Sequence, residues 1–322
     1  MALEQIRPVS VDALLEEFHT DCLDRGMTTE SIRRYESCLG IYLGFLKGQE
    51  RKVTILEVGN DELIGYIRHR RSGGKKDGSA VKQKTIENDF AAISSFYDFA
   101  EFKRYIQRNP VPPIRKRYLM RYKDASADDS EKDAKSIEQM AMLINSILNT
   151  RDKAIVLLLA KTGIRRGELI ALNVWDIDWE NLCLTLGRFK KRSNRWVFFD
   201  DETGRVLKQW LKIREGMNPT SDALFLNERG NRIQRNGVYS MVTKYAQKVG
   251  LHNAKSAKAK DHFNVHSCRH WFTTWLRRNG MDRDAIMILR GDRRKDSMSV
   301  YDHFTKEELR KAYLTHIPQL GV

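Results

Sequence analysis

The chain has 322 residues, and 41% of them are hydrophobic, which is enough for one large domain or two ordinary ones. Lysine and arginine outnumber acidic residues by 57 to 42, giving a net charge of +15 that predicts an anionic partner, with nucleic acid favoured over a membrane surface. No apolar run is long enough to cross a bilayer and no signal-peptide pattern is present, so we expect a soluble, cytoplasmic protein that does not bind membranes. The four scattered cysteines predict free core thiols.

Residues 8–110 predict a compact helical domain. Apolar residues recur at helical spacing in several segments, and Ser10 is a candidate N-cap for the first helix. Further helices are expected after Thr28, over 61–70, and around Phe90. These segments together predict a bundle of four or five helices.

Two basic segments belong to this half of the chain. A glycine-rich loop over 71–84 contains Lys82 and Lys84, and residues 102–123 carry eight lysines and arginines with no acid. Prolines should stop the helix in the second segment, so that an extended chain presents its charges either as a solvated linker or, as we favour, as a strap across a phosphate backbone. The candidate DNA-binding residues are Lys82, Lys84, Arg115, Lys116, Arg117 and Arg121.

Residues 111–134, which end in an acidic stretch, are expected to link the first domain to a second one over 135–322. The second domain should be mainly helical. Helices are expected at 136–149, 151–162, 165–172, 202–214, 235–249, 266–279 and 282–290. The β-rich runs 182–187 and 195–199 flank a basic turn and predict a hairpin.

Two motifs in the second domain each offer a guanidinium group. The stretch "TGIRRGEL" contains Arg165, and "HSCRH" places Arg269 one helical turn after His266. A planar guanidinium can hold two phosphodiester oxygens and stabilise the extra charge of a transition state. Either arginine alone could equally be an ion-paired or solvent-facing side chain, so the order of all the motifs is needed to decide.

That order is "TGIRRGEL", a basic β-turn, "HSCRH", a turn containing glycine, and an isolated tyrosine, Tyr301, near the end. The arrangement resembles the tyrosine recombinases, or phage-type integrases, and covers nearly the whole chain. The "RGD" of this sequence is similar to archaeal-type integrases, and Xer-like recombinases are the other close group. The resemblance implies a mainly α fold with a small antiparallel β-sheet, in which a helical core-binding (SAM-like) domain and a catalytic domain form a C-shaped clamp around duplex DNA.

The resemblance also implies roles for four residues of the two arginine motifs. Arg165 and Arg269 match the family's two arginines that clamp the scissile phosphate. Glu168 matches the acidic residue of the first motif and would support the site. His266 would assist proton transfer at the nucleophile or orient the phosphate.

Tyr301 matches the family's nucleophile, whose attack gives a 3′-phosphotyrosine and a free 5′-hydroxyl without ATP, cofactor or metal. Lys190, on the basic turn, matches the general acid that protonates the leaving oxygen, with Lys191 as the alternative for this role or as a DNA contact. Asp292 stands where the family usually has His or Trp. A carboxylate accepts hydrogen bonds but does not donate them, so either Asp292 orients a neighbour or another donor, such as His303, substitutes for it.

After Tyr301 the sequence predicts a short amphipathic tail helix that opens with a Thr305–Glu308 capping box. Such a helix either packs on its own domain or, as in the resembled family, docks on the neighbouring protomer of a tetramer assembled on paired DNA sites. The expected partners are therefore double-stranded DNA and further copies of the chain, and the expected location is the nucleoid.

Three other interpretations compete with this one. His262, His266 and His270 have helical spacing with Cys268 nearby, which would suit zinc if all lay on one helix, but we expect a loop before His266. A non-catalytic DNA-binding relative and a type IB topoisomerase-like enzyme would share most of these motifs. The biological task, either integration and excision of a mobile element or resolution of replicon dimers, is open at this point.

Overall fold

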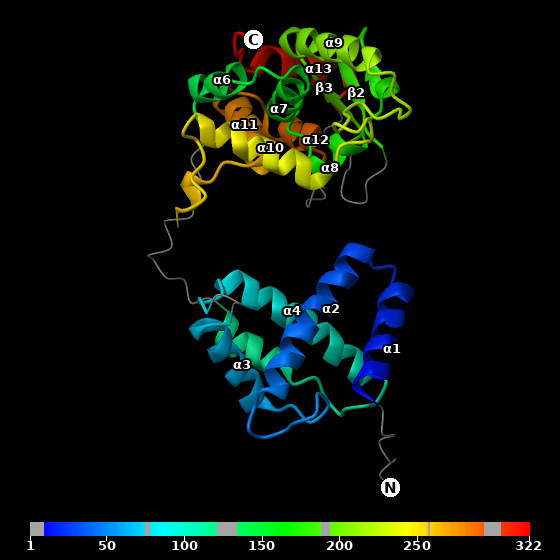
Figure 1. The fold of residues 1–322 in the computed structure, drawn as a ribbon, viewed down its shortest axis with the longest axis vertical. Coiled ribbons are helices and arrows are strands. Elements are labelled where there is room, and N and C mark those ends of the chain that lie inside the picture. Colours follow the sequence, from blue (N-terminus) through cyan, green and yellow to red (C-terminus); the bar gives the residue numbers. More distant parts are fainter. Residues whose placement is uncertain (1–9, 75–77, 121–133, 188–193, 257, 293–303) are drawn as a thin grey trace. The chain divides into compact units, whose positions relative to one another are not determined.

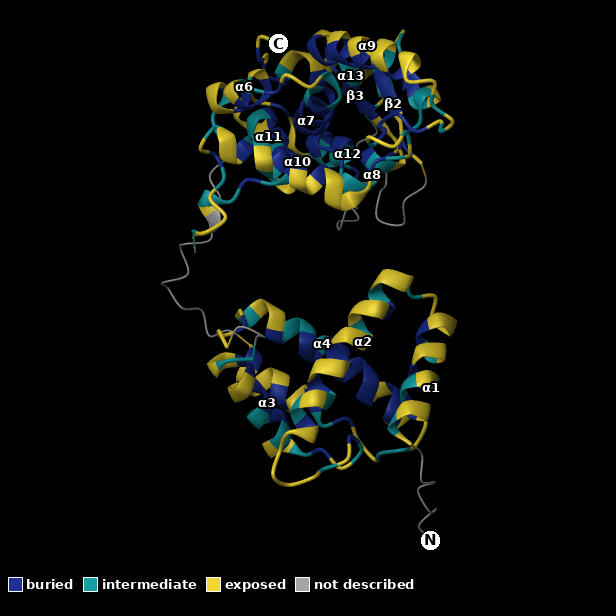
Figure 2. Ribbon diagram, in the orientation of Figure 1, coloured by how far each residue is buried: buried dark blue, intermediate teal, exposed yellow. Residues whose placement is uncertain are grey.

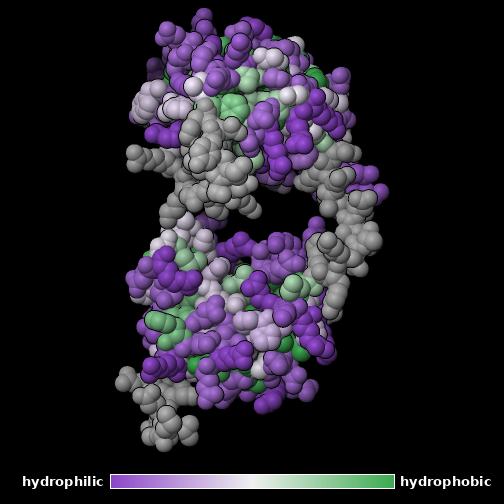
Figure 3. Space-filling model, turned by 180° about the vertical axis from the view of Figure 1, so that it is seen from behind, coloured by the Kyte–Doolittle hydropathy of each residue, from purple (hydrophilic) through white to green (hydrophobic). Residues whose placement is uncertain are grey.

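A computed structural model describes residues 10–74, 78–120, 134–187, 194–256, 258–292 and 304–322. The chain divides into two compact units, Met1–Asp124 and Ala125–Val322 (Figure 1). The described residues are mainly helical, with one small antiparallel sheet in the second unit, which confirms the predicted fold class. In the view of Figure 3 most of the visible surface of each unit is hydrophilic.

The first unit is built on four helices: α1 (Val11–Asp24), α2 (Thr29–Lys47), α3 (Asn60–Ser72) and α4 (Gln83–Phe102). Ser10 and Thr28 cap α1 and α2 by accepting hydrogen bonds from the N–H groups of Ala13 and Ser31. The buried faces of the four helices meet in one aromatic-rich core, and α4 contributes the largest share of its buried residues (Figure 2). The predicted helical bundle is therefore confirmed.

A buried ion pair fixes the end of α3. The Arg70 guanidinium lies 2.9 Å from the Asp89 carboxylate on α4, and it also donates to the carbonyl of Gly74 at 2.6 Å. The Arg70 carbonyl accepts from Val81 N–H. Arg70 thus contacts residues on both sides of the glycine-rich loop. These contacts fix the position of the start of α4, where Lys82 and Lys84 lie.

Part of the segment expected to be extended after α4, residues 111–119, is helical instead. A short helix α5 (Val111–Ile114) continues into a π-helical turn η1 (Arg115–Leu119). The prolines at positions 112 and 113 lie in the first turn of α5, where a missing N–H costs nothing, so they begin a helix rather than stop one. Three apolar side chains of this segment then pack into the core of the first unit: Val111, Ile114 and Leu119.

The second unit surrounds helix α7 (Thr150–Thr162), which is dark blue along nearly its whole length in Figure 2. Helices α9 (Asp201–Gly216) and α11 (Val265–Arg278) pack directly on it. The remaining helices are α6 (Ile137–Asn145), α8 (Arg166–Ala171), α10 (Arg235–Lys248), α12 (Arg283–Arg290) and α13 (Lys306–His316), with short 3-10 turns at Val174–Asp176 and Ala259–Asp261. The helix predicted over 151–162 is α7.

The sheet has the order β1 (Ile177–Asp178), β2 (Cys183–Thr185) and β3 (Trp196–Phe198), with both pairs antiparallel. The predicted hairpin is β2–β3, in which Leu184 pairs with Val197. Strand β1 was not predicted, because two residues carry no alternation that a sequence pattern could reveal. All four cysteines are free and buried, as predicted.

The tail helix α13 packs on α11 and α12 of its own unit, and Thr305 and Glu308 form the predicted capping box. The last residues are held by a buried charge cluster. Lys161 on α7 donates to Asp200, Glu202 and the carbonyl of Pro318 at 2.5, 2.7 and 2.5 Å. The Glu202 carboxylate in turn accepts from the N–H groups of residues 320–322.

Candidate active site

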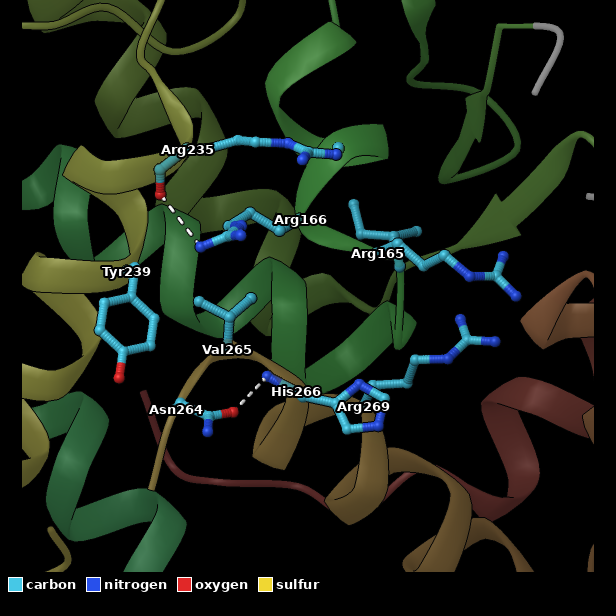
Figure 4. A pocket seen from close by; sticks show the side chains of 10 residues that line it. Arg165, Arg166, Arg235, Tyr239, Asn264, Val265, His266 and Arg269 are labelled. Atoms are coloured by element: carbon cyan, nitrogen blue, oxygen red, sulfur yellow. Dashed lines mark hydrogen bonds between the residues drawn. The ribbon is translucent and has the colours of Figure 1, made fainter. Parts of the chain in front are cut away.

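Arg165 lies at a sharp corner between α7 and α8. Helix α7 ends at Thr162 and is followed by its C-cap Gly163, whose φ of +59° is left-handed and therefore favours glycine. Residue 163 must also be small, because a Cβ there would lie 2.4 Å from a ring carbon of Phe272. The corner places Arg165 at the N-cap of α8, and in Figure 4 its side chain runs beside that of Arg269.

Glu168 holds Arg165 in this position. Its buried carboxylate accepts the backbone N–H of Arg165 at 2.7 Å and the guanidinium Nη1 at 3.1 Å. One side chain therefore fixes both the backbone and the guanidinium of Arg165. The two side chains form an i, i+3 ion pair.

Arg269 reaches the same place from α11. Its side chain is buried, and it donates Nη1 to the Gly163 carbonyl at 2.6 Å and Nη2 to the Arg290 carbonyl at 3.0 Å. Burial, together with the charges of Arg165 and Arg290, lowers the pKa of Arg269 to about 10. The group therefore stays cationic at neutral pH.

Asp292 joins the two arginines. Its Oδ1 accepts from Arg165 Nη2 at 3.0 Å and from Arg269 Nη2 at 2.9 Å, while Oδ2 lies 3.0 Å from Nε of Arg290. Helix α12 ends at Arg290, and the left-handed Gly291 turns the chain so that Asp292 meets the pair. Arg290 was not a predicted site residue, and nothing in the sequence marks it apart from its position beside "GD".

His266 lies on the first turn of α11, where Asn264 accepts its backbone N–H at 2.9 Å. Together with Arg165 and Arg269 it lines a cavity of about 450 Å³. The wall on the other side comes from Arg166 at the start of α8 and from Arg235 and Tyr239 on α10 (Figure 4). Arg235 and Tyr239 were missed from the sequence, because only the packing of α10 against α8 brings them to the site. Arg166 was not singled out, although it directly follows Arg165.

The predicted residues Lys190, Lys191 and Tyr301 lie outside the described residues, as does His303. Their places in the chain are bounded by elements that are described. Lys190 and Lys191 lie between β2 and β3 in the sequence, and Tyr301 and His303 precede α13.

The candidate DNA-binding residues of the first unit divide into two groups. Lys84, Arg115 and Lys116 line one surface cavity of about 620 Å³ between α4 and the α5–η1 segment. Lys82, the N-cap residue of α4, and Arg117 do not line this cavity, and Arg121 lies outside the described residues. Arg71 was not predicted, but it connects the two elements by donating to the Gln83 side chain and to the Tyr118 carbonyl.

His262 precedes α11 and lies 2.7 Å from the Ser256 carbonyl, whereas His266 and His270 are on the helix. Within the described ranges no three His, Cys, Asp or Glu side chains gather closely enough to hold a metal ion. No helix in those ranges is long and apolar enough to span a membrane.

Comparisons with known proteins give the same family for both parts of the chain. Residues 131–308, more than half of the sequence, match the phage integrase family, and residues 6–103 match the phage integrase N-terminal SAM-like domain. The chain is 25% identical over 312 residues to tyrosine recombinase XerD of Oceanobacillus iheyensis, covering 95% of this chain and 98% of that protein. It is 26% identical over 316 residues to tyrosine recombinase XerA of Saccharolobus solfataricus, covering 98% and 96%.

The solved structures that share the fold include two integrases bound to DNA. One is the Tn1549 transposon integrase in complex with transposon right-end DNA, with a TM-score of 0.65, 19% identity, and coverage of 92% of this chain and 97% of that one. The other is a lambda integrase dimer bound to a COC′ core site, with a TM-score of 0.65, 15% identity, and coverage of 91% and 77%. The matched domains and the fold together establish that this chain belongs to the phage integrase family of tyrosine recombinases.

Proposed function

We propose that this tyrosine recombinase cuts and rejoins duplex DNA at specific sites through a 3′-phosphotyrosine intermediate. The observation that carries the proposal is the convergence of Arg165 and Arg269, from α8 and α11, on one carboxylate oxygen beside an open cavity. Two guanidinium groups that can share one anionic oxygen can also share a phosphodiester.

In the proposed reaction, Arg165 and Arg269 hold the scissile phosphate and stabilise the charge that it gains in the transition state. Tyr301 Oη attacks phosphorus while the bond to the 5′ oxygen breaks, and His266 accepts the phenol proton or orients the phosphate. Lys190, with Lys191 as the alternative, gives a proton to the 5′ oxygen. Rejoining reverses these steps, so no energy source is consumed.

Asp292 would act in this reaction as a positioning residue. Two guanidinium groups that approach one phosphate repel each other, and the Asp292 carboxylate compensates this repulsion before DNA binds. Its side chain is 26% exposed, so the compensation is partly screened by solvent. A residue that accepts hydrogen bonds would thus replace the donor that stands here in most of the family.

The first unit would hold the DNA through the cavity between α4 and η1, which is lined by Lys84, Arg115 and Lys116 and by one acid, Glu87, that pairs with Lys84 at 3.1 Å. Lys82, Arg117 and Arg121 are proposed as further phosphate contacts, and the two domains as a C-shaped clamp. Recombination between two sites requires several protomers, for which we propose a tetramer in which the tail helix stays on its own unit or docks in trans. The reaction would serve mobile-element integration and excision or replicon dimer resolution, and it would place the protein on the nucleoid.

The test is covalent capture, which selects the target site from random DNA. Purified protein is incubated with a library of nicked suicide duplexes whose central segment is randomised, and protein–DNA adducts are isolated under denaturing conditions and sequenced. We expect a defined site to be enriched, with adducts that form in EDTA and carry the protein on a 3′ phosphate. The Tyr301→Phe variant should bind the enriched site and form no adduct.

Other outcomes would contradict the proposal in different ways. Tight binding without an adduct in the wild type would indicate a non-catalytic DNA-binding protein. Relaxation of supercoiled plasmid without any exchange between two copies of the enriched site would indicate a topoisomerase-like enzyme. Adducts that persist in Tyr301→Phe would assign the nucleophile to another residue.

A further inference from the structure

The site cavity extends well beyond the two arginines that converge on Asp292. At about 450 Å³ it is large enough for a nucleotide-sized group rather than for one phosphate alone. Its far wall is formed by Arg166, Arg235 and Tyr239, none of which is needed to hold the scissile phosphate in the proposed reaction (Figure 4). The cavity therefore offers a second set of donors.

The acids of the site lie away from this cavity. Glu168 and Asp292 contact the arginine pair, but neither is among the described residues that line the cavity wall. The lining instead contains four arginines and one histidine. Such a cavity has a positive potential that favours an anion, and its partly enclosed walls strengthen that potential.

Contacts between α8 and α10 set the position of the second pair of arginines. Arg166 Nη1 donates to the Arg235 carbonyl at 3.3 Å, which ties the first turn of α8 to the start of α10. The Arg235 guanidinium lies close to Gly167. Its Nη2 is 3.8 Å from the position that a Cβ on residue 167 would take. Since Arg166 follows Arg165 directly, the start of α8 contributes one arginine to each pair.

We propose that Arg166 and Arg235, with Tyr239 as an additional hydroxyl donor, form a subsite for a second phosphodiester of the cleaved DNA strand, beside the scissile phosphate. The inference rests on the proposed function. Successive phosphates of one strand follow each other every ~3.4 Å along the helix axis, so a strand whose scissile phosphate lies on Arg165 and Arg269 carries its neighbour into this part of the cavity. Holding two phosphates fixes the direction of the strand as well as its position.

The test removes the charge of one phosphate and the charge of one arginine, first separately and then together. In the DNA site recovered by covalent capture, single methylphosphonates replace each phosphate flanking the cleavage position in turn, and single-turnover adduct rates are measured with the full chain. For wild-type protein one flanking position should lower the rate about 10- to 100-fold, as expected for loss of a charge-assisted hydrogen bond. Arg235→Ala should lower the rate on unmodified DNA by a similar factor.

The decisive quantity is the combined effect. In Arg235→Ala the same methylphosphonate should cause a clearly smaller loss than in the wild type, because only Arg166 and Tyr239 remain to contact that phosphate. Arg166→Ala provides a second variant with the same expected pattern. Lys244→Ala removes a cation from the same helix α10 without touching the cavity, and it should retain the full methylphosphonate effect.

Multiplicative losses in both arginine variants would overturn the subsite while leaving the proposed function intact, because adducts would still form. A wild-type enzyme that is insensitive to every flanking methylphosphonate would overturn it as well. The absence of adducts from all substrates would instead reject the proposed function, and the subsite with it. Equal thermal unfolding midpoints for wild type and variants would confirm that the rate differences do not come from misfolding.

Discussion

Asp292 places one carboxylate oxygen within hydrogen-bond distance of both Arg165 and Arg269. This arrangement has two opposing consequences. The carboxylate holds together two cations that repel each other, and it also brings a negative charge to the place where a negative phosphate must bind. Removing the charge should therefore change DNA affinity and reaction rate in opposite directions.

We predict that Asp292→Asn binds the target site more tightly than wild type but forms the adduct about tenfold more slowly. Asp292→Ala, which retains no acceptor, should be slower again by a similar factor. Binding should be tighter because the Asp292 carboxylate no longer repels the phosphate. Cleavage should be slower because Arg165 and Arg269 are no longer held at a fixed distance from each other. Equilibrium binding and single-turnover adduct rates on the same duplex separate the two effects, and a parallel fall in both would show that Asp292 only stabilises the fold.

The general acid can be identified by changing the leaving group. An alkoxide leaves poorly without a proton, whereas a thiolate, whose acid has a pKa near 8.5, leaves without help. Lys190→Ala should lose about 10²- to 10⁴-fold on normal DNA and recover most of this loss on DNA with a sulfur atom in place of the 5′ bridging oxygen. Lys191→Ala is the matched control. With both duplexes at saturating concentration, so that a lost DNA contact does not limit the rate, it should change little on either substrate, while the reverse pattern would give the role to Lys191.

Sequence motifs alone locate Arg165, Glu168 and Arg269, because each is embedded in a short pattern with a chemical reason. They do not reveal that Asp292 bridges the arginines, since this contact joins positions 127 and 23 residues apart. The same limit applies to Arg235 and Tyr239. Their part in the cavity depends on how α10 packs on α8, and no local pattern encodes that packing.

At the scale of elements, the corner between α7 and α8 depends on Gly163. The residue has a left-handed φ, its carbonyl accepts from Arg269, and the Phe272 ring occupies the space where a side chain would begin. The corner therefore links backbone conformation, helix packing and the position of a proposed catalytic arginine.

We predict that Gly163→Ala destabilises the protein by roughly 3 kcal/mol or more, because a left-handed alanine costs about 1–2 kcal/mol and the clash with Phe272 adds to it. Gly250→Ala is the matched control, since its φ is +73° but no atom lies within 4 Å of the new Cβ. Gly250→Ala should destabilise the protein only by the cost of a left-handed alanine, about 1–2 kcal/mol. Urea unfolding measures both, and equal losses would show that the Phe272 contact relaxes freely.

Helix caps and apolar spacing are sufficient to predict most elements, including α1 after Ser10 and α13 after Thr305. Besides the two-residue strand β1, an exception is the 111–119 segment, where the prolines predict a helix stop and the structure has a helix start. Proline stops a helix from within but suits its first turn, and the sequence does not state which of these applies. The buried side chains of Val111, Ile114 and Leu119 decide the outcome through tertiary packing.

At the scale of the whole molecule, Lys161 connects the centre of the second unit to the end of the chain. Its buried ammonium contacts carboxylates of Asp200 and Glu202 and the Pro318 carbonyl. Burial raises the pKa of Glu202, but hydrogen bonds from Lys161 and from the tail N–H groups outweigh it, so the pKa is lower than its ordinary 4.5. The stability that Glu202 contributes is therefore present above pH 4.5 and is lost as the pH falls through its lower value in the folded protein.

We predict that Lys161→Met costs about 3–5 kcal/mol, because it leaves two buried carboxylates without a cation. Adding Asp200→Asn and Glu202→Gln to this variant should restore part of the loss, since the uncompensated charges are then gone. Urea unfolding at neutral pH measures wild type, the single variant and the triple variant. A triple variant no more stable than the single one would show that the cost comes from the lost tail contacts rather than from unpaired charge.

The largest-scale prediction concerns how the first unit adds to DNA affinity. If Arg115 and Lys116 each neutralise a phosphate, replacing both by alanine should reduce the slope of log affinity against log salt by ~1.8, which is ~0.9 per contact. Lys103→Ala is the matched control, because this exposed lysine shares a surface cavity with Glu16, Glu17, Asp21 and Asp24, where a phosphate would be repelled. The slope is the informative quantity rather than affinity at one salt concentration, because it counts the counterions displaced by the contacts themselves. An unchanged slope in the double variant would remove the α4–η1 cavity from the DNA interface, whereas a reduced slope with an unchanged adduct rate at saturation would assign the first unit to binding and leave the chemistry to the second.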